Sequence, residues 1–468
     1  MKKLLILFLL PLVSSAQSNC ALLLDSFMQA EVLVHHFNGN VLVAKSGNII
    51  FKKAFGYRNY DTKEPLDNNS VFELQSITKQ FTGLSILLLI EKGKLSLTDT
   101  LRKFFPELPY KNITIRALLT HTAGLPDDLQ VMTQYWNHKK VAYNKDLIHV
   151  LAGHKVPPHF LSGERVEYSN TAFELLASII EKVSGLSYAD FLQQNIFNPL
   201  GMRSSHVYTT THAAKQDLPN FAYGYVYSDS LKRYIMPALL PELDFVVFSD
   251  GISGAGNISS TAGDLLKWDR ALKNHKLLSK TMQDQMLSPQ SVCDSASQVY
   301  WGYGAHKLGK NELGEYIIGG GGWPGYEHAT IRYPKDDLTI IILSNNETNS
   351  RLLSGALAYI VMDRAVVKPY FHKETKIDST VLDRYVGKYI IPNVPKPTVM
   401  ELFKKKGKLL LRYENALIET ELRPESDTKF FNGSVPNQQI EFEVNSSGKL
   451  LKAFSIFGGM KKEIERIN

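Results

Sequence analysis

Cysteine is scarce in this chain: its 468 residues include two, Cys20 and Cys293, far apart in the sequence. The chain has no CxxC pair and no HExxH motif, which are spacings typical of zinc sites, so we expect no metal and no other cofactor. Basic residues outnumber acidic ones, 53 to 46, but they form no dense run with interleaved aromatic residues. We therefore expect a solvated basic surface and no nucleic-acid partner.

Long apolar runs are also missing beyond the N-terminus, so we expect no membrane-spanning segment in the mature chain. At the N-terminus, two lysines precede an apolar run from Leu4 to Val13, and three small residues ending at Ala16 follow it. This order is typical of a secretory signal peptide. We predict that residues 1–16 are removed and that the protein is secreted or periplasmic. Lipidation at Cys20 is disfavoured, because the Gln-Ser-Asn before it lacks the aliphatic residue of a lipoprotein signal.

Hydrophobic residues make up 44% of the chain and charged residues 21%, which is ordinary for a folded protein. The composition changes near Pro369, where the sequence is polar. We predict a large domain over residues 21–365, a linker over 366–377 and a small domain over 378–468. In the small domain, short apolar runs separated by Gly and Lys predict a β-barrel or β-sandwich; they cover residues 399–403, 409–413, 439–444 and 451–456.

The large domain mixes strand and helix patterns. Its apolar or alternating runs predict two pairs of strands, over residues 40–45 with 49–55 and 327–333 with 338–344. Residues 76–91 predict a helix that is apolar almost all round and therefore buried. A second helix is predicted over residues 171–183, ended by Ser184-Gly185.

The first candidate for chemistry is Ser76 followed by Lys79. Three positions apart on a helix, the two side chains share one face. A serine at a helix N-terminus meets exposed backbone N–H groups, and a desolvated lysine amine beside it can take up or stabilise the hydroxyl proton. The spacing alone is weak, because a capping serine and a solvated lysine give the same pattern. The apolar run that follows, from Gly83 to Ile90, favours a buried lysine.

The second candidate is Tyr168-Ser169-Asn170, just before the predicted helix. A phenol there can share a proton with a neighbouring hydroxyl or amine, and an amide can bind both a lysine and a substrate carbonyl. The simpler interpretation is that Ser169 or Asn170 only caps the helix.

The third candidate is the glycine run from Gly319 to Gly322, followed by Trp-Pro-Gly-Tyr. Glycines allow a substrate to lie against a strand edge and to bind its backbone groups. A flexible loop is the alternative. Gly320, Gly322 and Gly325 also match GxGxxG, but a predicted strand follows rather than a helix, which excludes dinucleotide binding.

These three segments, in this order, resemble the motifs of class A β-lactamases and penicillin-binding proteins, with a tyrosine in the second motif. Residues 113–126, 251–272 and 338–346 also resemble this family, and the resemblance covers roughly residues 30–350. Within it, the chain resembles the class C β-lactamase, D-alanyl-D-alanine carboxypeptidase and esterase group. The resemblance implies an α/β, serine β-lactamase-like fold: an antiparallel sheet flanked by helices, with a helical subdomain beside it.

The resemblance also implies roles for individual residues. Ser76 would be the nucleophile that is acylated, Lys79 would assist its deprotonation and Tyr168 would act as general base or acid. Asn170 would orient the substrate and Lys79. Gly321 and Gly322 would bind the substrate, with the backbone N–H groups of Ser76 and Gly322 as the oxyanion hole. Which of Lys79 and Tyr168 is the principal base stays open.

One position departs from the family pattern. The third motif normally starts with Lys or His, and Gly319 stands there in this chain. The missing cation would help to bind a substrate carboxylate, so its absence disfavours strong β-lactamase or carboxypeptidase activity and favours an esterase or another peptidase. His328 and Arg332 are candidates for a replacement cation. His121 is interpreted as structural, because the chain has no GxSxG elbow.

Two functions from different classes follow. The first is a secreted serine hydrolase that forms an acyl-enzyme on an amide, ester or β-lactam carbonyl. Its partner would be a small-molecule or peptide substrate, with cell-wall peptides among the candidates. The second is an inactive relative that binds cell-wall peptide or another ligand without turnover. The four residues Ser76, Lys79, Tyr168 and Asn170 favour the enzyme, and Gly319 favours the binding protein.

Overall fold

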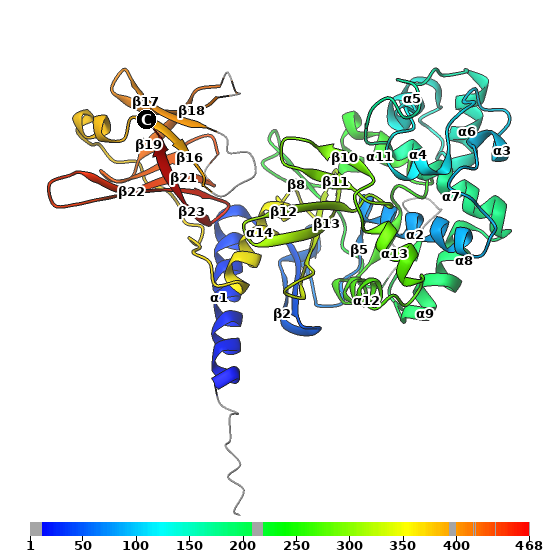
Figure 1. Cartoon of the computed structure of the whole chain (residues 1–468), viewed down its shortest axis with the longest axis horizontal. Helices are drawn as coiled ribbons and strands as arrows, with labels where there is room; N and C mark the ends of the chain where they lie inside the picture. Colours follow the sequence, from blue (N-terminus) through cyan, green and yellow to red (C-terminus); the bar gives the residue numbers. More distant parts are fainter. Residues whose placement is uncertain are drawn as a thin grey trace, which may run out of the picture. The chain divides into compact units, whose positions relative to one another are not determined.

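The computed structural model describes residues 12–207, 219–392, 399–414, 416, 418–435 and 437–467 (Figure 1). The chain divides into two compact units, which are described separately. The large unit is Phe37–Ser354, and the barrel unit combines Met1–His36 with Gly355–Asn468. The first eleven residues of the predicted signal peptide lie outside the described residues. The predicted domain boundaries at residues 365 and 378 stay predictions.

The large unit is built on an antiparallel sheet of eight strands in the order β10-β11-β12-β13-β14-β15-β1-β2. Every residue of β15 is buried, as expected for an apolar strand covered on both faces. Both predicted strand pairs are confirmed. The strands are β1 (Gly39–Lys45), β2 (Asn48–Phe55), β10 (Ser291–Asp294), β11 (Val299–Trp301), β12 (Lys307–Asn311), β13 (Gly314–Trp323), β14 (Tyr326–Tyr333) and β15 (Leu338–Ser344).

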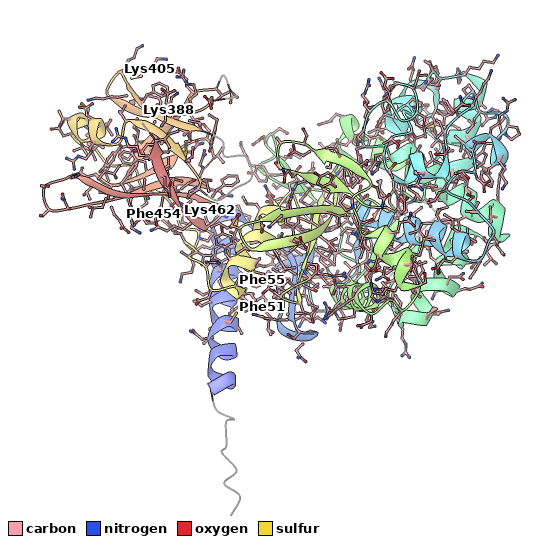
Figure 2. All side chains as sticks on the ribbon, viewed as in Figure 1. Phe51, Phe55, Lys388, Lys405, Phe454 and Lys462 are labelled. Carbon is pink, nitrogen blue, oxygen red and sulfur yellow. The ribbon has the colours of Figure 1, made fainter. Side chains whose placement is uncertain are left out.

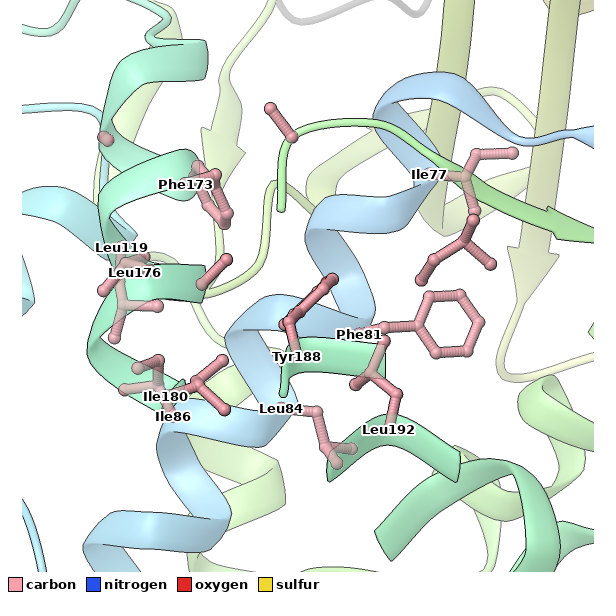
Figure 3. Packing of buried hydrophobic residues seen from close by; sticks show 14 of the residues in the cluster. Ile77, Phe81, Leu84, Ile86, Leu119, Phe173, Leu176, Ile180, Tyr188 and Leu192 are labelled. Carbon is pink, nitrogen blue, oxygen red and sulfur yellow. The ribbon is translucent and has the colours of Figure 1, made fainter. Parts of the chain in front are cut away.

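Helix α2 (Thr78–Glu91) is the central helix of the large unit, and residues 78–89 are buried. It lies beside α7 (Asn170–Ser184), and apolar side chains of both helices, such as Ile86 and Ile180, belong to one core cluster (Figure 3). The predicted helix over 76–91 is therefore confirmed from Thr78 onward. Ser76 lies just before it, in the 3-10 turn η1 (Gln75–Ile77), because the chain tightens as it leaves a strand.

The second predicted helix, over 171–183, is confirmed as α7. The Ser169 side chain caps its start by accepting a hydrogen bond from the backbone N–H of Ala172. Its end is Gly185, whose φ of 77° is the left-handed conformation that glycine adopts without steric cost. Both ends of the helix that carries Asn170 are thus set by local sequence.

Helices α3 to α7 gather on one side of the large unit and form the predicted helical subdomain (Figure 1). The remaining helices include α12, which packs on β15 and β1. Their bounds are α3 (Leu101–Phe104), α4 (Ile115–Leu119), α5 (Asp128–Tyr135), α6 (Asn144–Gly153), α8 (Tyr188–Leu192), η2 (Gln193–Phe197), α9 (Asn198–Leu200), η3 (Pro237–Leu239), η4 (Pro241–Leu243), α11 (Phe245–Phe248), α12 (Ala262–Lys273), α13 (Lys280–Met286) and α14 (Ser350–Val361).

Three small sheets accompany the large one among the described residues of this unit. The one that matters for the site is β5-β9-β6, since β5 leads directly into η1. The short strands are β3 (Tyr57–Asn59), β4 (Glu64–Pro65), β5 (Phe72–Glu73), β6 (His206–Val207), β7 (Val226–Ser228), β8 (Arg233–Ile235) and β9 (Ile258–Ser260).

The barrel unit holds eight antiparallel strands that close in chain order, with β23 returning to β16. Inward residues such as Tyr389 and Leu402 are buried, while Lys388 and Lys405 lie on the outside (Figure 2). The predicted small all-β domain is therefore a closed barrel. Its strands are β16 (Gly387–Ile390), β17 (Met400–Lys405), β18 (Lys408–Tyr413), β19 (Thr420–Pro424), β20 (Lys429–Asn432), β21 (Gln438–Val444), β22 (Leu450–Phe457) and β23 (Met460–Ile467).

The barrel unit also contains helix α1 (Leu12–His35) and the 3-10 turn η5 (Ser379–Arg384). The Lys368 ammonium donates a hydrogen bond to the Ser26 hydroxyl at 3.0 Å, which ties α1 to the segment before the barrel. Among the described helices, none combines the length and the hydropathy needed to cross a membrane.

Candidate active site

Ser76 is held by a constrained backbone. Strand β5 ends at Glu73, and the N–H of Leu74 donates to the carbonyl of Ile258 at 2.7 Å. Gln75 then has a φ of 52°, a left-handed conformation that non-glycine residues seldom adopt. Such strain persists where the surroundings fix it, often at functional sites. The turn directs the chain from the small sheet into α2 and exposes Ser76 to a cavity.

Lys79 is fully buried and directly contacts Ser76. Its ammonium donates to Ser76 Oγ at 3.1 Å, to Asn170 Oδ1 at 2.8 Å and to the carbonyl of Ala255 at 3.0 Å. Three acceptors match the three protons of an ammonium group. The predicted helical spacing of Ser76 and Lys79 therefore brings the two side chains together, and the solvated-lysine interpretation is wrong.

Tyr168 lies on the other side of the Ser76 hydroxyl. Its phenol donates to Ser76 Oγ at 2.7 Å, and 44% of its side chain is exposed. The Lys79 Nζ atom is 4.9 Å from the centre of the Tyr168 ring, a cation–π distance. Ser76, Lys79, Tyr168 and Asn170, predicted from separate segments, thus form one connected group.

His121 packs against the Tyr168 ring. Among the hydrogen bonds of the described residues, none joins His121 to Ser76. His121 is buried, its ring centre is 4.6 Å from that of Tyr168, and its Nδ1 accepts from the N–H of Ser169 at 3.1 Å. Burial lowers its pKa to about 3, with smaller contributions from Lys79 and Lys307. A neutral packed ring fits the structural role predicted for it.

The glycine run lies in β13, so the loop alternative is wrong. Strand β12 pairs with β13 only as far as Ile318, whereas residues 319–323 pair with β14 alone. Their other edge faces the turn before Ser76: a Cβ on Gly321 would stand 2.2 Å from the carbonyl oxygen of Leu74. The expected strand edge beside the nucleophile is present, and only glycine at position 321 permits its close approach.

Two cavities meet at Ser76. The first, of about 250 Å³, is lined by Ser76, Tyr168, Asn170 and Gly322 among others. The second, of about 390 Å³, is lined by Ser76, Tyr168 and residues 319–322. Gly322 borders both cavities. A carbonyl group beside Ser76 therefore lies at the junction of two spaces that could hold the two halves of a substrate.

Neither candidate for the replacement cation supplies a free positive charge to the site, although His328 lines the second cavity. His328 is buried, its Nε2 donates to the carbonyl of Glu73 at 2.7 Å, and its Nδ1 accepts from the N–H of Ser344 at 3.1 Å. Burial lowers its pKa to about 4, so it is neutral. Arg332 binds the carboxylate of Asp269 and borders a different cavity.

The cations that do line the second cavity are Lys307 and Arg351, which the sequence analysis missed. Lys307 is the partner of Ile318 across β12 and β13, one residue before the glycine run. Only the strand register brings it there, so the sequence carries no direct signal for it.

This geometry suits nucleophilic chemistry at Ser76. The hydroxyl has two proton-handling groups within hydrogen-bond distance, which is the arrangement that activates a weak nucleophile. The strand edge and the start of η1 present backbone groups beside it, where charge on a carbonyl oxygen would develop. Among the described residues, no cluster of His, Cys, Asp and Glu is suited to hold a metal.

The fold and this site define the serine β-lactamase and penicillin-binding-protein class. A family model described as Beta-lactamase matches residues 29–360. Penicillin-binding protein 4* of Bacillus subtilis (strain 168) is 35% identical over 439 residues, which cover 92% of this chain and 95% of that protein. The chain therefore belongs to the β-lactamase family of serine hydrolases.

Comparison with solved structures supports the same family. A penicillin-binding protein from Bacillus halodurans has a TM-score of 0.61 at 26% identity and covers 73% of this chain and 98% of its own. A D-stereospecific amidohydrolase from a Streptomyces species has a TM-score of 0.56 at 22% identity, covering 70% and 94%. At that identity the second comparison establishes the shared fold alone.

Proposed function

We propose that this protein is a secreted serine hydrolase that forms an acyl-enzyme at Ser76 on an amide, ester or β-lactam carbonyl. The observation that carries the proposal is the position of Ser76 Oγ, 3.1 Å from Lys79 Nζ and 2.7 Å from the Tyr168 hydroxyl, at the border of two cavities.

The reaction has two halves. The first half requires Lys79 as a neutral amine or Tyr168 as a phenolate, since the ammonium and the phenol only donate to Ser76 Oγ. Ser76 Oγ attacks the carbonyl carbon while its proton passes to that deprotonated group, and the bond to the leaving nitrogen or oxygen then breaks as that atom takes up the proton. Water next attacks the acyl carbon and gives its proton to the same group, and the bond from that carbon to Ser76 Oγ breaks as Oγ takes up this proton, which releases the acid and restores the serine. The backbone N–H groups of Ser76 and Gly322 would stabilise the negative oxygen in both halves.

The substrate preference follows from the third motif. Gly319 gives no side-chain cation at the position where the family has Lys or His. We therefore propose an ester or a peptide as the physiological substrate in preference to a β-lactam. Esters and activated amides should turn over faster than penicillins on this site.

The alternative is a relative that binds a ligand without turnover, and Gly319 is the observation that favours it. The test is steady-state hydrolysis of p-nitrophenyl esters, amino-acid p-nitroanilides and nitrocefin by the wild type and by Ser76→Ala. We expect turnover of at least one ester or amide that Ser76→Ala abolishes. Turnover equal in both proteins, or none with folded wild type, would favour the binding protein.

Secretion is a separate part of the proposal. Residues 1–16 would be removed as a signal peptide, with the cut after Ala16, inside the sequence that α1 spans. Intact mass of the protein exported by a bacterial host tests this: we expect a chain beginning at Gln17. A chain that keeps its N-terminal residues and stays with the cells would contradict export.

A further inference from the structure

Two acidic side chains, Asp128 and Glu174, lie together beside the catalytic group. Asp128 is the first residue of α5, and Glu174 follows Asn170 by one turn on α7. Only 7% of Asp128 and 4% of Glu174 is exposed, yet both line the first cavity together with Ser76. The folding of the chain thus brings two buried carboxyl groups to the wall of the substrate cavity.

The described part of the protein leaves one oxygen of each carboxyl group without a hydrogen bond. The Asp128 carboxyl lies within hydrogen-bonding reach of Glu174 and Asn170, but its Oδ1 atom and Glu174 Oε2 are buried and have no hydrogen-bond partner among the described residues. Buried polar atoms are normally paired, because an unpaired one costs free energy. Burial raises the pKa of both carboxyls. The neighbouring Asp127 raises the pKa of Asp128 further, Asp128 does the same for Glu174, and Lys79 opposes these effects with a smaller lowering of both pKa values.

The other ionisable side chains of the cavity wall include further acidic residues. Glu73 and Asp250 also line it, and no Lys, Arg or His is among its described lining residues. Lys79 lies nearby, but its ammonium donates its three hydrogen bonds to Ser76, Asn170 and Ala255. Acidic lining residues with no cation among them favour a positive ligand.

We propose that the first cavity is a subsite for a primary ammonium group of the substrate, with Asp128 and Glu174 as its acceptors. An ammonium would donate to the two unpaired oxygens, and its positive charge would favour the ionised form of the carboxyls. The proposal rests on the proposed function and narrows it: the preferred substrates are amides or esters that carry an ammonium group within reach of Ser76, such as aminoacyl or lysine-containing peptides.

In the rival account, Asp128 and Glu174 only stabilise the positive charge of Lys79 and bind no substrate group. The two accounts differ in substrate preference. If the pair only tunes Lys79, Glu174→Gln and Asp128→Asn should change the turnover of charged and neutral substrates equally. If the pair binds ammonium, both variants should reduce the preference for the charged substrate, while Glu164→Gln, which removes an exposed carboxylate, should keep it.

The experiment measures binding without turnover. In the Ser76→Ala protein, titration calorimetry compares 6-aminohexanamide with heptanamide, which have equal chain length and differ by the ammonium. We expect binding of 6-aminohexanamide to be at least about 10-fold tighter, and we expect Glu174→Gln and Asp128→Asn, each confirmed as folded by circular dichroism, to reduce that ratio toward one.

Equal affinities in Ser76→Ala, or no measurable binding of either amide, would overturn the subsite. This outcome is independent of acylation. If the Ser76→Ala protein prefers the ammonium ligand but the wild type is never acylated at Ser76, the subsite stands and the proposed hydrolase is refuted. If the wild type is acylated but shows no preference for the ammonium ligand, the hydrolase stands and the subsite is refuted.

Discussion

Asn170 Oδ1 accepts a hydrogen bond of 2.8 Å from Lys79 Nζ, which joins the first residue of α7 to the first turn of α2. Lys79 loses one of three acceptors if this amide is removed, and an unpaired buried donor costs about 1–3 kcal/mol. We expect Asn170→Ala to slow acylation of Ser76 by about 10- to 100-fold, measured as the pre-steady-state burst with an activated ester. Asn68→Ala, at an exposed position, should leave the burst unchanged. Equal bursts in Asn170→Ala and wild type would contradict the role of this bond.

Tyr168→Phe tests proton transfer with little effect on packing. The ring contact with His121 remains, and only the hydroxyl at 2.7 Å from Ser76 Oγ is lost. A positioned acid or base contributes about 10²- to 10⁴-fold, so we expect kcat/KM to fall by that factor while the melting temperature stays within a few degrees. The matched control is Tyr135→Phe, another partly exposed tyrosine. Retention of full activity by Tyr168→Phe would assign proton transfer to Lys79 alone.

Gly321→Ala should damage the site, and Gly320→Ala should not. A Cβ on Gly321 would stand 2.2 Å from the carbonyl oxygen of Leu74, two residues before Ser76, whereas one on Gly320 meets nothing nearer than 3.7 Å. Overpacking of this kind costs about 1–3 kcal/mol. We expect Gly321→Ala to lose that much stability in denaturant titration and most of its activity. Similar behaviour of the two variants would contradict the close approach of β13 to the turn.

His328 predicts a defined dependence of stability on pH. Burial lowers the pKa of His328 from its ordinary value of 6.5 to about 4. As the pH falls below 6.5, the imidazole therefore binds a proton in the unfolded chain while it is still neutral in the folded chain. Its contribution to stability is therefore fully present above pH 6.5 and is lost as the pH falls toward 4. This amounts to at most about 3 kcal/mol.

The comparison with His328→Gln isolates this contribution, because the other titrating groups are common to both proteins. The difference in unfolding free energy between wild type and variant should narrow by up to about 3 kcal/mol between pH 7.5 and pH 4. Unfolding free energies from urea titrations at several pH values give this difference. A difference that does not change with pH would mean that His328 is not buried as a neutral ring.

Much of the fold could be predicted from the sequence because local patterns decide it. The strands 327–333 and 338–344 and the helix that begins near Asn170 follow from alternation, apolar runs and the Ser184-Gly185 end. Ser76 and Lys79 could be paired from their spacing together with the apolar run that follows, since about one helical turn separates them. The start of α2 was misplaced by two residues, because the strain at Gln75 has no signature in composition.

The groups that the sequence analysis missed are those that only tertiary structure brings together. Lys307 reaches the second cavity through the register of β12 on β13, and Asp128 and Glu174 come from different helices to the wall of the first cavity. His328 and Arg332 were wrongly considered as replacement cations, because their neighbours Ser344 and Asp269 are distant in sequence. Sequence spacing identifies chemistry within one turn of helix but not across a sheet.

The central claim is that Ser76 is acylated, and intact-mass spectrometry tests it most directly. The mature protein is incubated with a fluorophosphonate and, separately, with a fluorescent penicillin, and Ser76→Ala is the control. The account predicts a covalent adduct with the fluorophosphonate that is absent from Ser76→Ala, and weaker labelling by the penicillin. No adduct with either reagent in folded wild-type protein, or an adduct that persists in Ser76→Ala, would contradict it.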